Sequence, residues 1–245
     1  MKLTKKKKVV SREEHLISDT TPFSVKESFN LLRTNIIYSA TNSEGAAVYG
    51  ISSATAASGK STVIANLAIS LANMSKRVLL VDADMRCPVQ SKLFGYKKEA
   101  TGLSEILSGI IKNKAEAIIT LPQHENLFII PSGFIPPNPA ELLMSAKFRD
   151  LVAELKGEFD IILFDFPPIG VVTDSIAAVE CFDGYIFVVR SGVSKIGDIK
   201  QSISQIETLG GKIVGIVLNG VESSEKKYGK YYGYGKYSTS YHHNS

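Results

Sequence analysis

The stretch "AVYGISSATAASGKSTVIANLAISLA", residues 47–72, decides the fold that we predict for this chain. Residues 47–53 form an almost wholly apolar run of strand length, and residues 61–72 repeat apolar side chains at helical spacing. A short loop with a single glycine, Gly59, joins the two. A buried strand that passes through such a loop into an amphipathic helix is typical of α/β proteins.

Further apolar runs rich in valine and isoleucine follow at residues 77–83, 126–132, 159–166, 184–191 and 212–220. Residues 61–75, 138–156 and 196–211 show helical periodicity between them, and residues 102–121 also look helical. Continuously apolar strands separated by helix-length segments indicate a parallel sheet that is covered on both faces. We therefore predict a doubly wound α/β domain with a mostly parallel sheet from about residue 45 to 221, preceded by a helix over residues 24–40. In this helix Ser24 is a candidate N-cap, with Glu27 completing a capping box.

Both ends of the chain differ in composition from this domain. Residues 1–23 carry the basic run Lys2 and Lys5 to Lys8, and residues 222–245 contain glycine, lysine, serine and tyrosine without an aliphatic residue. A segment of that kind cannot close a core, so we predict a flexible, disordered tail with its aromatic rings displayed. The domain prediction is thus a basic arm (1–23), an α/β domain with its N-terminal helix (24–221) and a tyrosine-rich tail (222–245). The displayed tyrosines are Tyr228, Tyr231, Tyr232, Tyr234, Tyr237 and Tyr241.

Composition excludes several classes of protein. No apolar run approaches the roughly 18 residues that cross a bilayer, and the N-terminus lacks the apolar region of a signal peptide. The two cysteines, Cys87 and Cys181, have no metal-ligand spacing. We expect a cytoplasmic protein whose membrane attachment would come through a partner or through surface charge.

The loop before the first helix carries the phosphate chemistry. Gly59, Lys60, Ser61 and Thr62 form the second half of a P-loop, in which backbone N–H groups cradle phosphate, the lysine reaches the β/γ-phosphates and the serine hydroxyl binds Mg²⁺. The usual first glycine of that motif is replaced by Ala54. Its position between a strand and a helix predicts a nucleotide site.

Three carboxylates end the neighbouring strands. Asp82 and Asp84 close one apolar run and Asp165 closes another, so all three are expected at the carboxyl edge of the sheet, beside the P-loop. Three carboxylates around one triphosphate would repel one another without a divalent cation. The sequence therefore predicts ATP and Mg²⁺ as ligands.

The order of these motifs resembles that of the bacterial tyrosine kinases, P-loop proteins that control capsule and exopolysaccharide synthesis. The matching motifs are "GKST", "VDADMR", "PPNPAELL", "DFPP" and the terminal tyrosine cluster. The resemblance implies an ATP-dependent protein tyrosine kinase that phosphorylates its own tail in trans within a homo-oligomer, which in the family is ring-shaped. It assigns nucleotide binding to Ala57, Ser58, Gly59, Lys60, Ser61, Thr62 and, at the adenine, Asn219; the metal to Ser61, Asp84 and Asp165; and catalysis to Asp82 as base, Lys60 and Arg86.

The resemblance also implies partners. Glu27 and Arg33 would lie at the subunit contact, where Asn30 replaces an arginine of the family pattern. A separate membrane protein would recruit the kinase to the inner face of the membrane and activate it through a short cytoplasmic segment, and a tyrosine phosphatase and other proteins would be substrates.

Two other functions fit parts of the sequence. A partitioning or septum-positioning ATPase shares the fold, but it typically carries a lysine early in the P-loop, and none lies between Gly50 and Gly59. A tail that binds single-stranded nucleic acid would explain its aromatic and lysine residues but not the complete ATP site, so we expect no nucleic acid partner.

Overall fold

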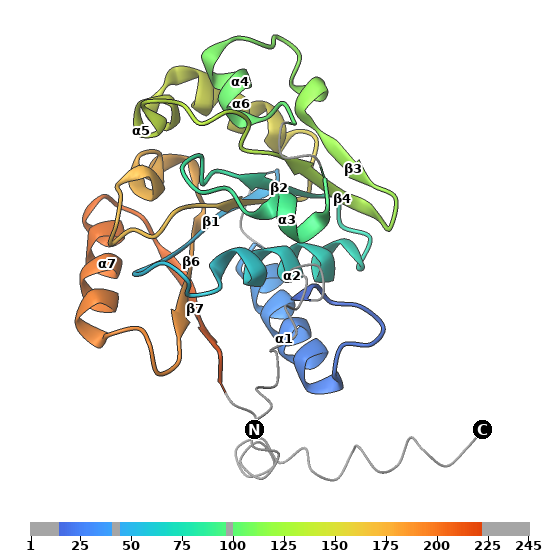
Figure 1. Ribbon diagram of the computed structural model, residues 1–245, viewed down its shortest axis with the longest axis vertical. Helices are drawn as coiled ribbons and strands as arrows, with labels where there is room; N and C mark the ends of the chain where they lie inside the picture. Colours follow the sequence, from blue (N-terminus) through green and yellow to red (C-terminus); the bar gives the residue numbers. More distant parts are fainter. Residues whose placement is uncertain (1–14, 41–44, 97–99, 222–245) are drawn as a thin grey trace, which may run out of the picture.

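The computed structural model describes residues 15–40, 45–96 and 100–221 (Figure 1). Within these residues the strands form one seven-stranded sheet in the order β3-β4-β2-β5-β1-β6-β7. Neighbouring strands are parallel except for β3 and β4, which are antiparallel. The predicted doubly wound, mostly parallel sheet is therefore confirmed. The strands are β1 (Ala47–Ser53), β2 (Val78–Asp82), β3 (Ile119–Leu121), β4 (His124–Ile130), β5 (Ile161–Asp165), β6 (Gly184–Arg190) and β7 (Ile213–Asn219).

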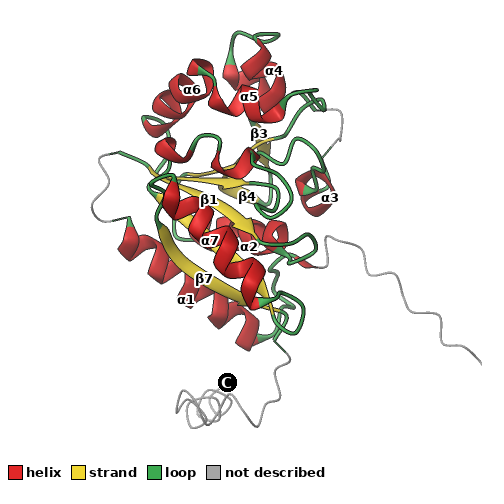
Figure 2. Cartoon of the chain, turned by 90° about the vertical axis from the view of Figure 1, so that its left-hand side faces the viewer, coloured by secondary structure: helices red, strands yellow, loops and turns green. Residues whose placement is uncertain are grey.

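Helices cover both faces of the sheet (Figure 2). The sheet separates two hydrophobic cores, and alternate residues of β1 point into each: Tyr49 and Ile51 pack on one side and Val48 on the other. The first core includes α1 (Phe23–Ser39), α2 (Lys60–Ala72) and α3 (Gln90–Phe94). The second includes α4 (Leu103–Ser108), α5 (Pro139–Met144), α6 (Ala146–Lys156) and α7 (Ile196–Thr208). The described residues also contain the short 3₁₀ helices η2 (Lys114–Ala117), η3 (Asp174–Ile176) and η4 (Val179–Cys181).

The carboxyl edge of the sheet brings the three motif-bearing strands together. β5 lies between β1 and β2, with Asp165 in register with Ile51 on one side and Asp82 on the other. Because parallel strands end at the same edge, the P-loop that follows β1 lies next to the two carboxylates.

The predicted capping box at the start of α1 is wrong. The helix begins at Phe23, with Pro22 in the N-cap position at φ −52° and ψ 141°, and no side chain caps it. Ser24 is already inside the helix, whereas a capping serine needs non-helical backbone angles. Residues 15–22, predicted as part of the basic arm, lie against α2: the Asn66 amide donates to the His15 carbonyl (3.0 Å) and accepts from the Ile17 N–H (2.6 Å).

Two predicted helices are interrupted in the structure. Residues 138–156 form α5 and α6, separated at Ser145, where ψ is 156° and the side-chain oxygen accepts from the Phe148 N–H at 3.2 Å. Residues 102–121 are not one helix, because Gly109 ends α4 at φ +74° and β3 pairs with β4 at the sheet edge. Apolar spacing alone did not distinguish this short edge strand from helix.

Some sequence predictions fall on residues outside those described. They concern residues 1–14, with the lysine run, and the tail from residue 222, with its six tyrosines. In the part of the chain that is described, no helix has the length and apolar character needed to cross a membrane.

Candidate active site

The P-loop is held in place by the end of β7. Gly59 has φ +84° and directly precedes α2, and a Cβ atom at this position would approach the Asn219 Nδ2 to 2.1 Å. That amide donates to the Ser58 carbonyl at 3.0 Å, and Arg190 Nη1 donates to the Ala57 carbonyl at 2.7 Å. Asn219, predicted at the adenine, therefore also braces the loop.

Lys60 lies between two of the predicted carboxylates. Its ammonium nitrogen is 3.3 Å from Asp84 Oδ2 and 3.5 Å from Asp165 Oδ1, and it donates to Ser61 Oγ at 3.3 Å. Burial alone would lower the pKa of the Lys60 ammonium, but the negative charges of Asp165 and Asp84 outweigh it and raise that pKa. Lys60 thus remains a cation at neutral pH, placed to neutralise phosphate oxygens.

Asp82, like Asp165, is a fully buried carboxyl group of the site. Its Oδ2 accepts from the Gln90 N–H at 3.2 Å, and its Oδ1 has no partner within the described residues. Burial first, and the nearby Asp165 second, raise the pKa of Asp82 well above its usual value. The unpartnered oxygen is a hydrogen-bond acceptor that the protein itself does not satisfy.

Gln90 is a site residue that sequence reasoning missed. It has no exposed surface, and its Nε2 donates to Asp165 Oδ2 at 2.8 Å and to the Ser61 carbonyl at 3.2 Å. A single glutamine after an irregular loop gives no periodic or motif signal, so only the fold shows its position.

Arg86 forms a two-point ion pair with Asp174. Its Nε and Nη2 lie 2.7 and 3.1 Å from the two carboxylate oxygens, and this hydrogen bonding raises the pKa of the guanidinium. Asp174 is buried and belongs to η3, after β5. The resemblance placed Arg86 among the catalytic residues, and in this structure its side chain holds the segment that carries Asp174.

The donor set suits a hard cation. Asp84, Asp165 and the Ser61 hydroxyl offer oxygen atoms around Lys60, and Mg²⁺ in nucleotide sites typically takes one or two carboxylates together with substrate phosphates. The described residues contain no cluster of three or more acidic, histidine or cysteine side chains arranged to hold a metal by themselves. The residues present therefore fit Mg²⁺ that arrives with a nucleotide.

The two residues predicted at a subunit contact both make bonds within the chain. Arg33 Nη1 donates to the Ser70 carbonyl at 3.2 Å and to its hydroxyl at 3.3 Å, while Glu27 accepts from Asn30 Nδ2 at 2.7 Å. Arg33 thus joins α1 to the P-loop helix α2.

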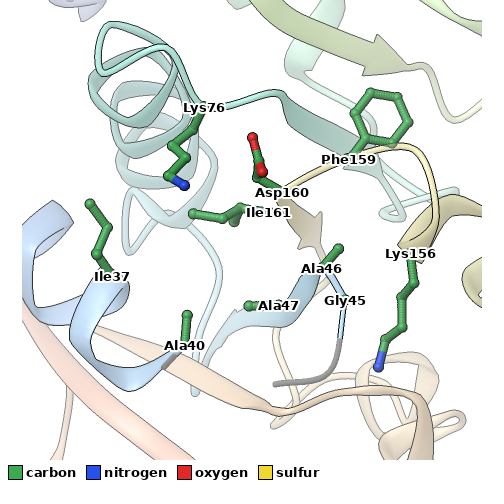
Figure 3. A pocket seen from close by; sticks show the side chains of 10 residues that line it. All are labelled: Ile37, Ala40, Gly45, Ala46, Ala47, Lys76, Lys156, Phe159, Asp160 and Ile161. Carbon is green, nitrogen blue, oxygen red and sulfur yellow. The ribbon is translucent and has the colours of Figure 1, made fainter. Parts of the chain in front are cut away.

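A separate cavity of about 400 Å³ opens at the amino edge of the sheet, away from these residues. Most of its lining residues are apolar, and Lys76 and Lys156 extend on opposite sides of it (Figure 3). None of the predicted site residues lines this cavity.

Known proteins match most of the length of this domain. Residues 47–212 match the family model described as an AAA domain. The tyrosine-protein kinase CpsD of Streptococcus agalactiae is 37% identical over 86% of this chain and 90% of its own length. The tyrosine-protein kinase YwqD of Bacillus subtilis is 34% identical over 93% of this chain and 92% of its own.

Solved structures show the same relationship. The crystal structure of the chimerical protein CapA2B2 superposes with a TM-score of 0.76 at 33% identity, covering 84% of this chain and 89% of that one. The septum site-determining protein MinD of Pyrococcus horikoshii matches less well, with a TM-score of 0.62 at 29% identity over 74% of this chain and 73% of its own. The likeness to MinD reflects the shared P-loop fold.

Proposed function

This chain belongs to the bacterial tyrosine-protein kinases, and from that premise we propose that it transfers the γ-phosphoryl group of ATP to tyrosine hydroxyls, including those of its own tail. The observation that carries the proposal is the Lys60 ammonium between Asp84 and Asp165, next to a buried Asp82. A loose phosphoryl-transfer transition state needs positioning and charge neutralisation, and these residues supply both.

Each residue has one part in the reaction. Backbone N–H groups of residues 57–62 cradle the phosphates, and Lys60 balances negative charge on the β- and γ-phosphates. Asp82 accepts the proton of the tyrosine hydroxyl as the new O–P bond forms and the bond to the leaving ADP breaks. Ser61, Asp84 and Asp165 would hold Mg²⁺, which supplies positive charge at the phosphates when bound.

Arg86 and Asn219 act beside this centre. Through Asp174, Arg86 holds the segment that follows β5, and Asn219 at the end of β7 contacts adenine while it braces the P-loop. These assignments are supported by the position of both residues next to the loop and the carboxylates.

The substrates proposed for the chain are the tail tyrosines of a neighbouring subunit, followed by other proteins such as a tyrosine phosphatase. A tail with Lys226, Lys227, Lys230 and Lys236 suits an acidic site. Each phosphotyrosine adds about −1.5 to −2 charges, so modified tails would repel one another and the oligomer would come apart. Native mass spectrometry that found the same oligomer before and after phosphorylation would exclude this disassembly.

The setting proposed for the kinase is the inner face of the membrane, in the control of capsule or exopolysaccharide synthesis. A membrane protein would recruit and activate it through a cytoplasmic segment, with Glu27 and Arg33 at the contact between kinase subunits. The support is the relationship to CpsD and to the chimerical CapA2B2.

Phosphotyrosine mass spectrometry tests the proposal. The purified protein is incubated with Mg²⁺ and ATP, with and without an activator segment, beside Lys60→Met and Asp82→Asn variants. Phosphate on tail tyrosines that is lost in both variants is the expected result. ATP hydrolysis without any tyrosine phosphorylation would instead favour an ATPase switch of the MinD kind.

A further inference from the structure

Gln90 contacts all three motifs of the active site. Its backbone N–H donates to Asp82 Oδ2 at 3.2 Å, and its side-chain amide donates both to Asp165 Oδ2 at 2.8 Å and to the Ser61 carbonyl at 3.2 Å. One residue with no solvent exposure thus joins the P-loop to both neighbouring carboxylates.

These bonds leave each carboxylate with one oxygen fixed and one directed elsewhere. In Asp165, Oδ2 is occupied by the Gln90 amide, and Oδ1 faces Lys60 at 3.5 Å. In Asp82, Oδ2 is occupied by the Gln90 N–H, and Oδ1 has no partner within the described residues. A carboxylate held by one oxygen cannot rotate freely, so its second oxygen keeps a fixed direction.

Gln90 is itself held rigidly. It is the first residue of α3, which is followed by Gly95 at φ +70°, and Leu93 and Phe94 of the same helix are buried in the core that includes α2. Its Oε1 is a second buried acceptor without a partner among the described residues. Gln90 and Asp82 thus each keep one unsatisfied buried acceptor, which suits donors that enter with the substrates, such as the waters of a cation.

We propose that Gln90 is a positioning residue for phosphoryl transfer, which orients Asp165 and Asp82 relative to the P-loop and thereby couples cation binding to nucleotide binding. The inference rests on the proposed kinase function, which gives these carboxylates their roles. Gln90 acts through the carboxylates, and the P-loop backbone binds the nucleotide phosphates without it.

The test compares Gln90→Met, which keeps the length of the side chain and removes the amide, with Gln123→Met, the same change in an exposed turn between β3 and β4. ADP binding is measured by calorimetry on the full chain, with and without Mg²⁺. In the Gln90 variant we expect the Mg²⁺-dependent gain in ADP affinity to fall about tenfold or more, the range seen when residues that orient metal ligands are replaced. The affinity of the Gln90 variant for ADP without Mg²⁺ should stay unchanged. The Gln123 control should keep both its ADP affinity and its thermal unfolding temperature.

Three results would overturn the proposal. Equal weakening of ADP binding with and without Mg²⁺ would show that Gln90 acts on the P-loop or the fold as a whole, and an unchanged Mg²⁺ effect would show that its side chain does not orient Asp165. Gln90→Asn, whose shorter amide does not reach Asp165, is the second variant and should behave like Gln90→Met. If neither variant folds, the role of Gln90 is structural and the proposal is wrong.

The same preparations separate this inference from the kinase proposal. Phosphotyrosine on the unsubstituted protein reports the kinase function, whereas the Mg²⁺ effect on ADP binding reports the role of Gln90. Loss of the Mg²⁺ effect in a protein that never phosphorylates tyrosine would leave Gln90 as a positioning residue of an ATPase and reject the kinase.

Discussion

At the carboxyl edge of the sheet, β1, β2 and β5 end in Ser53, Asp82 and Asp165, none of which is exposed to solvent. At the amino edge a cavity of about 400 Å³ is lined mainly by apolar residues, with Lys76 and Lys156 on opposite sides (Figure 3). At the carboxyl edge, Gln90 and Lys60 hydrogen-bond the buried carboxylates, whereas most residues that line the amino-edge cavity are apolar. Buried polar groups gathered from different strands mark the chemistry of this fold better than the size of a hollow does.

A pair of lysine substitutions is expected to show the largest difference in activity between the two edges of the sheet. Lys60→Met removes the cation that lies between Asp84 and Asp165, so tyrosine phosphorylation should fall about 100- to 1,000-fold, the range for loss of one preorganised charge-stabilising group. Lys76→Met makes the same change at the amino edge and should alter the rate less than about twofold, as expected of an exposed residue away from the site. Initial rates of phosphotyrosine formation decide between them. Similar losses in both variants would mean that the two edges do not differ in function.

A pair of glycine substitutions tests how tightly the carboxyl edge is packed. Gly59 and Gly210 have nearly the same φ, +84° and +83°, but a Cβ atom at Gly59 would meet the Asn219 amide at 2.1 Å, whereas at Gly210 nothing lies within 4 Å. Gly210→Ala should therefore cost only the backbone strain of about 1–2 kcal/mol. Gly59→Ala should cost about 1–2 kcal/mol more, because Asn219 must also leave the Ser58 carbonyl.

Urea unfolding of the two glycine variants measures these free energies. The nucleotide affinity of Gly59→Ala should also fall, since the displaced Asn219 no longer braces the loop. Equal destabilisation at both positions would show that the contact between the P-loop and β7 contributes nothing.

The ion pair of Arg86 and Asp174 tests whether the carboxyl edge acts as one unit. The Arg86 side chain is 44% exposed and that of Asp174 only 1%, so screening by solvent limits the coupling energy to about 1 kcal/mol. Arg86→Met and Asp174→Asn should each slow phosphorylation up to about tenfold, and the double variant should be no slower than either one, because they remove the same interaction. Rates of the four proteins form a double-mutant cycle. Additive losses would instead show that Arg86 has a role of its own, such as contact with phosphate.

The sequence predicted the parts of this edge that follow from strand ends and from one loop motif. Continuous apolar runs identified six of the strands, and the period of two along a strand placed Asp82 and Asp84 beside the P-loop. Gln90 and Asp174 were not predicted, because they reach the site from segments that carry no motif. Their positions depend on how α3 packs on α2 and how the chain turns after β5, which are tertiary effects.

Local geometry was harder to predict than the arrangement of strands. Ser24 has the residue type of an N-cap, yet the N-cap position is occupied by Pro22, two residues earlier, and the helix begins at Phe23. Ser145, inside an apparently continuous helical pattern, caps a second helix instead. For both helices the sequence was compatible with several N-terminal boundaries, and packing selected one of them.

The P-loop backbone gives the smallest expected effect. Ala57 has φ +59°, a left-handed conformation that costs an L-residue about 1–2 kcal/mol and glycine almost nothing. Because glycine gains about 0.4–1 kcal/mol of conformational entropy in the unfolded chain, Ala57→Gly should stabilise the protein by a net ~0.5–1 kcal/mol. Urea unfolding measures this change.

Ala56→Gly is the matched control, because Ala56 is an adjacent alanine of the same loop that is not among the residues with positive φ. Ala56→Gly relieves no backbone strain, so the greater conformational entropy of glycine in the unfolded chain should destabilise this variant. Stabilisation by Ala57→Gly together with unchanged or tighter ADP binding would show that the strain has no part in holding phosphate. Stabilisation with weaker ADP binding would show that the strained alanine keeps the loop in its binding conformation, as the close contacts of the carboxyl edge suggest.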